Sequence, residues 1–284
     1  MPIYTTNAPQ TFLPFEVGQL LIEPIIQQSR ATLVGNVIRT TAAQFRIPVV
    51  ATDAAAGWTA EGAEIAPSDA VLAEAVVNFG KLAGLSIVSN EMLADAVPQI
   101  AQVIGDGLAR DISMKLDVAF FGTKGASTVQ PAGLRDLPTT GAGSVTTISA
   151  GGAWANIDAF TSAVYAAANV GAQLGGFVAN PTDALLLAQI KQLAGGSVPL
   201  LQPDPTSSGA VTVAGVPLLT SPAVQVGTIW GVPAGRAYVV IREDATVTVD
   251  SSAFFSSDRS AVRAVLRVGF AFPHPASIVR VTKA

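Results

Sequence analysis

Hydrophobic residues recur at three- and four-residue steps between Asn90 and Phe121, and this spacing predicts the longest helix of the chain. The apolar positions of the stripe are Ile100, Val103, Ile104, Leu108, Ile112, Leu116 and Phe120. A helix of about 20 to 25 residues spans ~30 to 38 Å at a rise of about 1.5 Å per residue, which is long for a compact domain. We therefore expect this helix to act as a spine.

Two apolar runs on the N-terminal side predict a long β-hairpin. The outgoing strand is expected over Arg39 to Val50 and the returning strand over Val71 to Ser89, with a polar stretch rich in Gly and Ala between them. Two strands alone expose both faces and lack a core, so such a hairpin requires a surface to lie on. An ordinary hairpin on the surface of its own chain is the alternative interpretation.

The C-terminal half predicts an α/β subdomain followed by strands. After a linker at residues 138–152, a helix is expected over Trp154 to Val170, a strand over Gly176 to Ala179, and a second helix, Asp183 to Leu193, after a turn and cap at Asn180. Further strand-like runs are Thr212 to Leu219, Gly227 to Val232, Ala237 to Ile241, Thr246 to Val249 and Ser260 to Val268.

The last of these runs has two interpretations. Apolar residues and arginines alternate along it, with Val262, Ala264, Leu266 and Val268 on one face and Arg259, Arg263 and Arg267 on the other. Arginines four residues apart would also line one face of a helix. We favour the strand, because the run is rich in β-branched valines and a glycine and a proline soon end it.

The N-terminus predicts an arm. Residues 1–15 contain three prolines and little periodicity, and residues 16–30 have an imperfect helical pattern that Pro24 kinks or divides. An arm that cannot pack on its own core usually packs on a neighbour.

Composition points to a surface covered by other protein. Charged residues make up 13% of the 284 residues and hydrophobic types 50%, whereas soluble proteins average about 25% charged. Prolines, glycines and polar residues interrupt the uncharged stretch from Pro205 to Gly235, so it predicts no membrane span. The absence of Cys excludes disulfides, and a net charge of -4 with scattered basic residues disfavours sequence-specific nucleic-acid binding.

Candidate chemistry is sparse, and we expect no enzyme, no cofactor and no metal site. The single histidine, His274, lies between two prolines, and the Gly122–Ser127 stretch lacks the spacing of a phosphate loop. Glu61 and Glu64 could act as a general acid and base, which leaves a hydrolase as one alternative. Because they lie in the expected hairpin loop, we interpret them instead as solubilising or inter-subunit charges.

Taken in order, several segments resemble the major capsid proteins of tailed bacteriophages, the Hong Kong 97 type, over nearly the whole chain. The third of them carries the Gln-Pro-x-Gly pattern of the family at Gln130, Pro131 and Gly133. The segments are FRIPV (45–49), WTAEGAEI (58–65), KLAGLSIVSNEMLADA (81–96), LARDISMKLDVAFFGTKGASTVQPAGL (108–134), FVANPTDALLLAQIK (177–191), LLQPDP (200–205) and AFFSSDRSAVRAVLRVG (253–269).

The resemblance implies an α+β fold with an N-terminal arm, an extended β-hairpin loop, a long spine helix, and peripheral and axial domains. On this basis the chain divides into five parts. They are an arm and short helix (1–38), the extended loop and flanking strands (39–89), the spine helix and peripheral domain (90–137), the axial domain (138–235) and a return to peripheral strands (236–284).

The implied function is a structural major capsid protein that self-assembles as pentamers and hexamers into an icosahedral head enclosing double-stranded DNA. The implied partners are further copies of the chain, a separate scaffold protein, a portal and a decoration protein, with DNA enclosed but not read in sequence and no membrane. We expect assembly in the host bacterial cytoplasm and a final location in the virion. An encapsulin-type compartment shell is the alternative with the same fold.

Two departures from the family pattern bear on cohesion and processing. Some members form crosslinks from a Lys in the extended loop, but residues 51–79 contain no Lys. Many also carry a charged N-terminal scaffolding segment that a protease removes, whereas this sequence starts just before the arm. We expect non-covalent cohesion, together with a separate scaffold protein or an already trimmed chain.

The mechanism we expect is interlocking of neighbouring subunits. The hairpin tip, with Trp58, Glu61 and Glu64, is expected to lie over an adjacent subunit near basic groups. The candidates for those groups are Arg259, Arg263 and Arg267.

Overall fold

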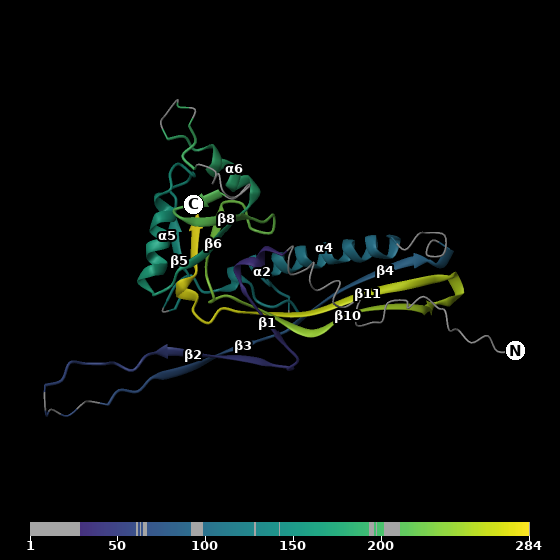
Figure 1. The fold of residues 1–284 in the computed structure, drawn as a ribbon, viewed down its shortest axis with the longest axis horizontal. Helices are drawn as coiled ribbons and strands as arrows, with labels where there is room; N and C mark the ends of the chain where they lie inside the picture. The colour runs from purple at the N-terminus through teal and green to yellow at the C-terminus, as the bar shows by residue number, and fades with distance from the viewer. Residues whose placement is uncertain are drawn as a thin grey trace.

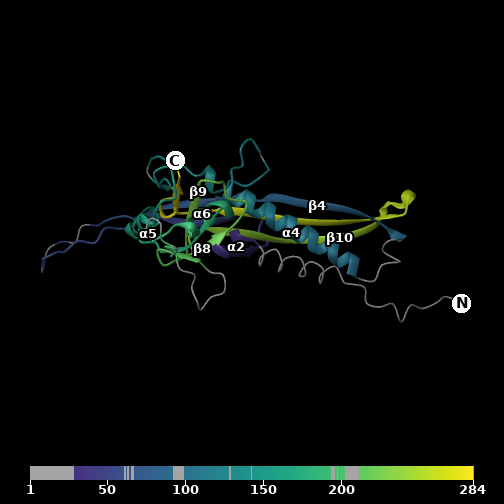
Figure 2. The same cartoon turned by 90° about the horizontal axis from the view of Figure 1, so that it is seen from above.

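Helix α4 (Gln99–Phe121) lies along a four-stranded sheet, and together they form the elongated half of the molecule (Figures 1 and 2). The computed structural model describes residues 29–60, 62, 64, 67–91, 99–127, 129–141, 143–192, 196, 198–201 and 211–283. In the order in which they pair, the strands of this sheet are β1 (Asn36–Thr40), β10 (Tyr238–Phe254), β11 (Arg259–Ala271) and β4 (Gly80–Ser89).

The predicted spine helix is confirmed at 23 residues. Its buried face carries Ala109, Ile112, Leu116 and Phe120, as the three- and four-residue spacing indicates. A Cβ added at Gly84 of β4 would lie 3.1 Å from a methyl carbon of Leu108. This contact fixes which face of the long sheet the helix covers.

A six-stranded sheet forms the compact half, with helices α5 (Asp158–Asn169) and α6 (Pro181–Gln189) (Figure 1). Its core contains Phe160 and Ala163 of α5 and Phe177 of the sheet, all fully buried. In pairing order, the strands are β5 (Thr146–Ser149), β12 (Val279–Thr282), β9 (Thr228–Pro233), β6 (Leu174–Ala179), β8 (Val216–Thr220) and β7 (Val211–Val213).

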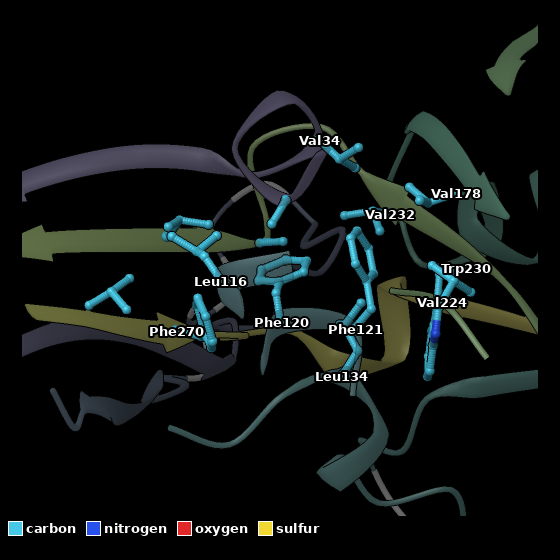
Figure 3. Packing of buried hydrophobic residues seen from close by; sticks show 14 of the residues in the cluster. Val34, Leu116, Phe120, Phe121, Leu134, Val178, Val224, Trp230, Val232 and Phe270 are labelled. Carbon is cyan, nitrogen blue, oxygen red and sulfur yellow. The ribbon is translucent and has the colours of Figure 1, made fainter. Parts of the chain in front are cut away.

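One hydrophobic cluster joins the two halves (Figure 3). The rings of Phe120 and Phe121, at the end of α4, meet edge to face with centroids 5.0 Å apart. The same cluster contains Trp230 and Val232 of β9 and Phe270 of β11. Since both sheets contribute to one buried core, they are held in a fixed relation to each other.

The predicted hairpin is confirmed as a separate two-stranded sheet, β2 (Phe45–Thr52) paired with β3 (Val71–Val77), which projects from one end of the body (Figure 1). Its base packs on the long sheet, because Val77 is buried in a small cluster with Val240 and Ala271. The short elements that complete the fold are α2 (Arg30–Val34), η1 (Leu134–Asp136), η2 (Phe255–Ser257) and η3 (Pro275–Ser277).

Several predicted strands have different bounds. The run over 71–89 divides into β3 and β4 where the chain crosses Gly269 of β11; a Cβ there would lie 2.5 Å from a Val77 methyl carbon. The run over 212–219 divides into β7 and β8, because Ala214 and Gly215 form a turn with φ of 51° and 79°. The runs at 237–241 and 246–249 are one strand, β10, with a register shift between Arg242 and Thr246.

Other elements were placed incorrectly or missed. The predicted linker at 138–152 contains β5, and helix α5 begins at Asp158 and not at Trp154. Helix α6 ends at Gln189, before the predicted end at Leu193. Strand β12, which we did not predict, pairs with β5 and β9 of the six-stranded sheet.

The arm over residues 1–15 lies outside the described residues, as does nearly all of the short helix predicted over 16–30. The five-part division of the chain therefore stays a prediction.

Candidate assembly surfaces

The loop at the tip of the hairpin exposes a tryptophan. Trp58 has a relative accessibility of 107%, so it makes no burying contact within its own chain. Glu64, Asp53 and Asp69 in the same loop are also exposed, and Glu61 lies outside the described residues. Tryptophan is a large apolar side chain that proteins usually bury, and a fully exposed one marks a contact surface.

One face of the hairpin is open and carries apolar residues around one ion pair. The strand register places Val50 opposite Leu72 and Arg46 opposite Val76. Val50, Leu72 and Val76 are 44%, 73% and 49% exposed. Arg46 and Glu74 form an ion pair of 3.1 Å between Nη1 and Oε2 across the same face. The opposite face is closed only at its base, where Phe45 and Ile47 pack against the Val77 cluster.

The long sheet presents basic and apolar residues on the face away from α4. On β4, Leu82 packs towards the core while Lys81, Leu85 and Ile87 are exposed. On β11, the predicted alternation is confirmed: Ala264, Leu266 and Val268 are buried and Arg263 is exposed. The strand interpretation of Ser260 to Val268 is therefore correct, and the helical alternative is wrong.

Strand pairing gives the basic residues defined neighbours. Arg263 lies opposite Leu85 of β4 and Thr248 of β10, and its Nη2 donates to the Thr248 hydroxyl at 3.3 Å. Arg267 lies opposite Lys81 and Arg242, which places three cations in one row across the sheet. Like charges directly opposite each other are unfavourable.

The structure does not bring the predicted tip residues and the predicted arginines together within one chain. The loop between β2 and β3 lies at one end of the molecule, and β11 begins with the exposed Arg259 at the other end (Figures 1 and 2). A contact between the two groups therefore requires two chains.

Two buried carboxylates were missed by sequence reasoning. Asp117 of α4 accepts hydrogen bonds from the Ser29 hydroxyl at 2.5 Å and from the backbone N–H groups of Arg30 and Ala31 at 3.0 and 2.9 Å. It thereby caps α2, which has no cap from its own N-cap side chain. The one available signal was an aspartate inside the apolar stripe of the spine helix.

Asp183 has a similar structural role in the compact half, where it also accepts hydrogen bonds from distant segments. It is fully buried and accepts from the indole N–H of Trp154 at 2.9 Å and from the backbone N–H of Gly227 at 2.7 Å. Asn180, the predicted cap, accepts from the Thr182 N–H at 3.1 Å, as expected. Since each carboxylate is occupied by donors of its own chain, both act in folding.

The Gly122–Ser127 stretch is a turn. The Asp136 carboxylate accepts from the Thr123 hydroxyl and from the backbone N–H groups of Lys124 and Gly133, the latter two at 2.8 and 3.0 Å. Burial raises the pKa of Asp136, but these hydrogen bonds outweigh it and bring the pKa below its usual value. These backbone N–H groups are therefore already bonded to a carboxylate of the same chain, whereas a phosphate loop would offer its N–H groups to a ligand.

No described histidines, cysteines, aspartates or glutamates form a group of three that could hold a metal ion. Among the helices that the structure describes, none is long and apolar enough to cross a membrane. His274 precedes η3, and its carbonyl oxygen accepts from the backbone N–H and the hydroxyl of Ser277.

Comparison with known proteins decides the family. The model of the phage capsid family matches residues 12–283. The chain belongs to the phage capsid family. No curated protein matches it in sequence at a significant level.

Solved structures show the same fold at low sequence identity. The "Capsid of native GTA particle" is 20% identical, with a TM-score of 0.72 over 99% of this chain and 94% of the other. A chain from Mycobacterium phage Adephagia is 18% identical, with a TM-score of 0.72 over 90% of each chain. One from Microbacterium phage Oxtober96 is 17% identical, with a TM-score of 0.72 over 99% and 95%.

These matches establish the α+β capsid fold of the Hong Kong 97 type. The family match makes the chain a structural capsid protein of the virion.

Proposed function

We propose that this major capsid protein assembles as pentamers and hexamers into an icosahedral bacteriophage head that encloses double-stranded DNA, and that it catalyses no reaction. The projecting hairpin carries the proposal, because it exposes Trp58 and an apolar strand face far from the core of its own chain. Exposed apolar surface of this extent favours burial against protein. In a closed shell every subunit both offers this surface and receives it.

The receiving surface is the face of the long sheet away from α4 on a neighbouring subunit. Leu85 and Ile87 supply apolar area there, 60% and 46% exposed, and Arg259, Arg263 and Arg267 supply positive charge. The hairpin segment 51–79 holds five acidic residues and no Lys or Arg, and one of the five, Glu74, pairs with Arg46 of β2. The other four make the two surfaces complementary. One exposed ion pair contributes only ~0 to 1 kcal/mol, so apolar burial supplies most of the stability and charge sets the register.

Other partners follow from the same role. We propose a separate scaffold protein, a portal and a decoration protein as partners, with assembly in the host cytoplasm before DNA enters. A net charge of -4 suits a container that encloses DNA without adhering to it. Since segment 51–79 has no Lys, the contact between hairpin and neighbour is non-covalent.

Deleting residues 54–68 tests the proposal. The deletion removes Trp58, Glu61 and Glu64 but leaves the packed base of the hairpin, so the subunit should stay folded. We expect soluble subunits with an unchanged circular dichroism spectrum and few closed shells by electron microscopy. The point variant Arg263→Glu should impair assembly more than folding. Normal yields of closed shells from the deletion variant would refute the proposal.

A further inference from the structure

A second basic site lies where β12 meets the edge strand β5. In the strand register, Arg280 of β12 lies between Thr147 of β5 and Trp230 of β9. Its guanidinium carbon is 5.7 Å from the centroid of the Trp230 ring. Because Trp230 is buried in the shared core, the ring fixes where the guanidinium lies.

Arg135 brings a second guanidinium to this place. It belongs to η1, whose neighbour Leu134 is buried in the same cluster as Trp230. A hydrogen bond of 2.8 Å from the Val145 N–H to the Pro138 carbonyl ties the segment after η1 to the start of β5. The two arginines are thus held together by the core and by the backbone.

Among the residues that the structure describes, no carboxylate forms an ion pair with either arginine. Burial lowers the pKa of Arg280, and the positive charge of Arg135 lowers it further. The Nε atom of Arg280 is buried without a hydrogen-bond partner among the described residues. Arg280 is half-buried and Arg135 is exposed. Two neighbouring cations without a carboxylate partner, one of them with an unused donor, are the arrangement that an oxyanion stabilises.

We infer that Arg135 and Arg280, with the Thr147 hydroxyl at the exposed rim, bind a carboxylate from a second copy of this chain. A guanidinium offers its donors as a rigid planar fork that matches the two oxygens of a carboxylate. The inference rests on the proposed self-assembly. It adds a contact in the compact half, separate from the contact between the hairpin and the long sheet.

The charge balance of the chain favours a second copy as the source of the anion. The sequence has 20 acidic and 16 basic residues, so every copy carries carboxylates in excess of its own cations. A free phosphate ion offers similar chemistry, and the experiment separates the two sources.

The test compares the assembly of Arg135→Gln, Arg280→Gln and Arg280→Lys subunits with the wild type. Arg110→Gln, an exposed change on α4, loses the same charge and serves as the control. We expect each glutamine variant of the pair to raise the subunit concentration needed for shell formation by about tenfold, the effect of losing one charge-assisted contact. Arg280→Lys keeps the charge without the fork and should lie between Arg280→Gln and the wild type.

Two readouts separate this contact from a role in folding. The exposed Arg135→Gln variant should melt like the wild type as an unassembled subunit. In the double glutamine variant, the rise in the subunit concentration needed for shell formation should be smaller than the product of the two single rises, because both arginines hold one anion.

Wild-type assembly by Arg135→Gln would overturn the inference while leaving the hairpin proposal standing. Calorimetric binding of inorganic phosphate to isolated subunits, lost in Arg135→Gln with assembly unchanged, would also overturn it and assign the site to a free anion. Conversely, if the 54–68 deletion variant assembles normally and the assembly of Arg135→Gln is impaired, the hairpin proposal alone is refuted.

Discussion

At the scale of single residues, buried carboxylates fix the positions of segments that are far apart in sequence. Asp117 of the spine helix holds the start of α2, 86 to 88 residues away, through the Ser29 hydroxyl and two backbone N–H groups. A longer contact of 3.4 Å from the Ser221 hydroxyl reaches the same carboxylate from the compact half. One side chain therefore joins α2, the spine and the loop after β8.

Replacing Asp117 with alanine should lower the free energy of unfolding by about 2 to 4 kcal/mol, because it leaves several buried donors without an acceptor. Urea denaturation of unassembled subunits would measure the loss. The matched control is Asp111→Ala, an exposed position on the same helix, where a change within about 0.5 kcal/mol is expected. Equal effects of the two substitutions would show that the carboxylate does not hold α2.

At the scale of elements, glycine decides where the hairpin leaves the body. The chain passes from β3 to β4 directly over Gly269, where a Cβ would lie 2.5 Å from a Val77 methyl carbon and 2.8 Å from the Asn78 carbonyl oxygen. Only a residue without a side chain allows this approach. Gly105 in α4 offers a contrast, because a Cβ there meets nothing within 4 Å.

Gly269→Ala should destabilise the subunit by about 1 to 3 kcal/mol through overpacking at the hairpin base. Gly105→Ala should stabilise it by up to about 1 kcal/mol, since alanine is the better helix former. Thermal melting of both variants as unassembled subunits gives the comparison. A Gly269→Ala subunit as stable as the wild type would contradict the close crossing.

The sequence allowed prediction of elements whose pattern is local. The 3.6-residue stripe of α4 and the alternation in β11 are readable without a partner. Strands β5 and β12 have four residues each; they pair with each other across more than 100 positions, and β12 also pairs with β9. Strand β10 continues through its charged stretch at Arg242 because β11 pairs with it on both sides of the register shift.

The sequence allowed us to predict that the functional surfaces are contacts between subunits, but it did not show all the residues that form them. Low charge and an acidic hairpin indicated inter-subunit contacts, and the exposed Trp58 and Arg263 agree with surface positions. Arg135 and Arg280 come close together only through the fold, which brings η1 near β12, and no local sequence pattern predicts this. Which residues touch across copies stays a prediction.

At the scale of the whole molecule, the shape explains the proposed assembly. The chain has a packed body, in which one core joins two sheets, and a hairpin that leaves the body at one end (Figure 1). The body has a buried core of its own, whereas the hairpin beyond its packed base keeps exposed apolar residues that another copy could bury. We therefore expect subunits that fold first and interlock afterwards.

Electron microscopy of shells assembled from the purified chain tests this account most directly. The account predicts closed particles in which the loop around Trp58 lies over the long sheet of an adjacent subunit, beside Arg263. A hairpin folded back on its own subunit, or projecting into solvent in a complete shell, would contradict it.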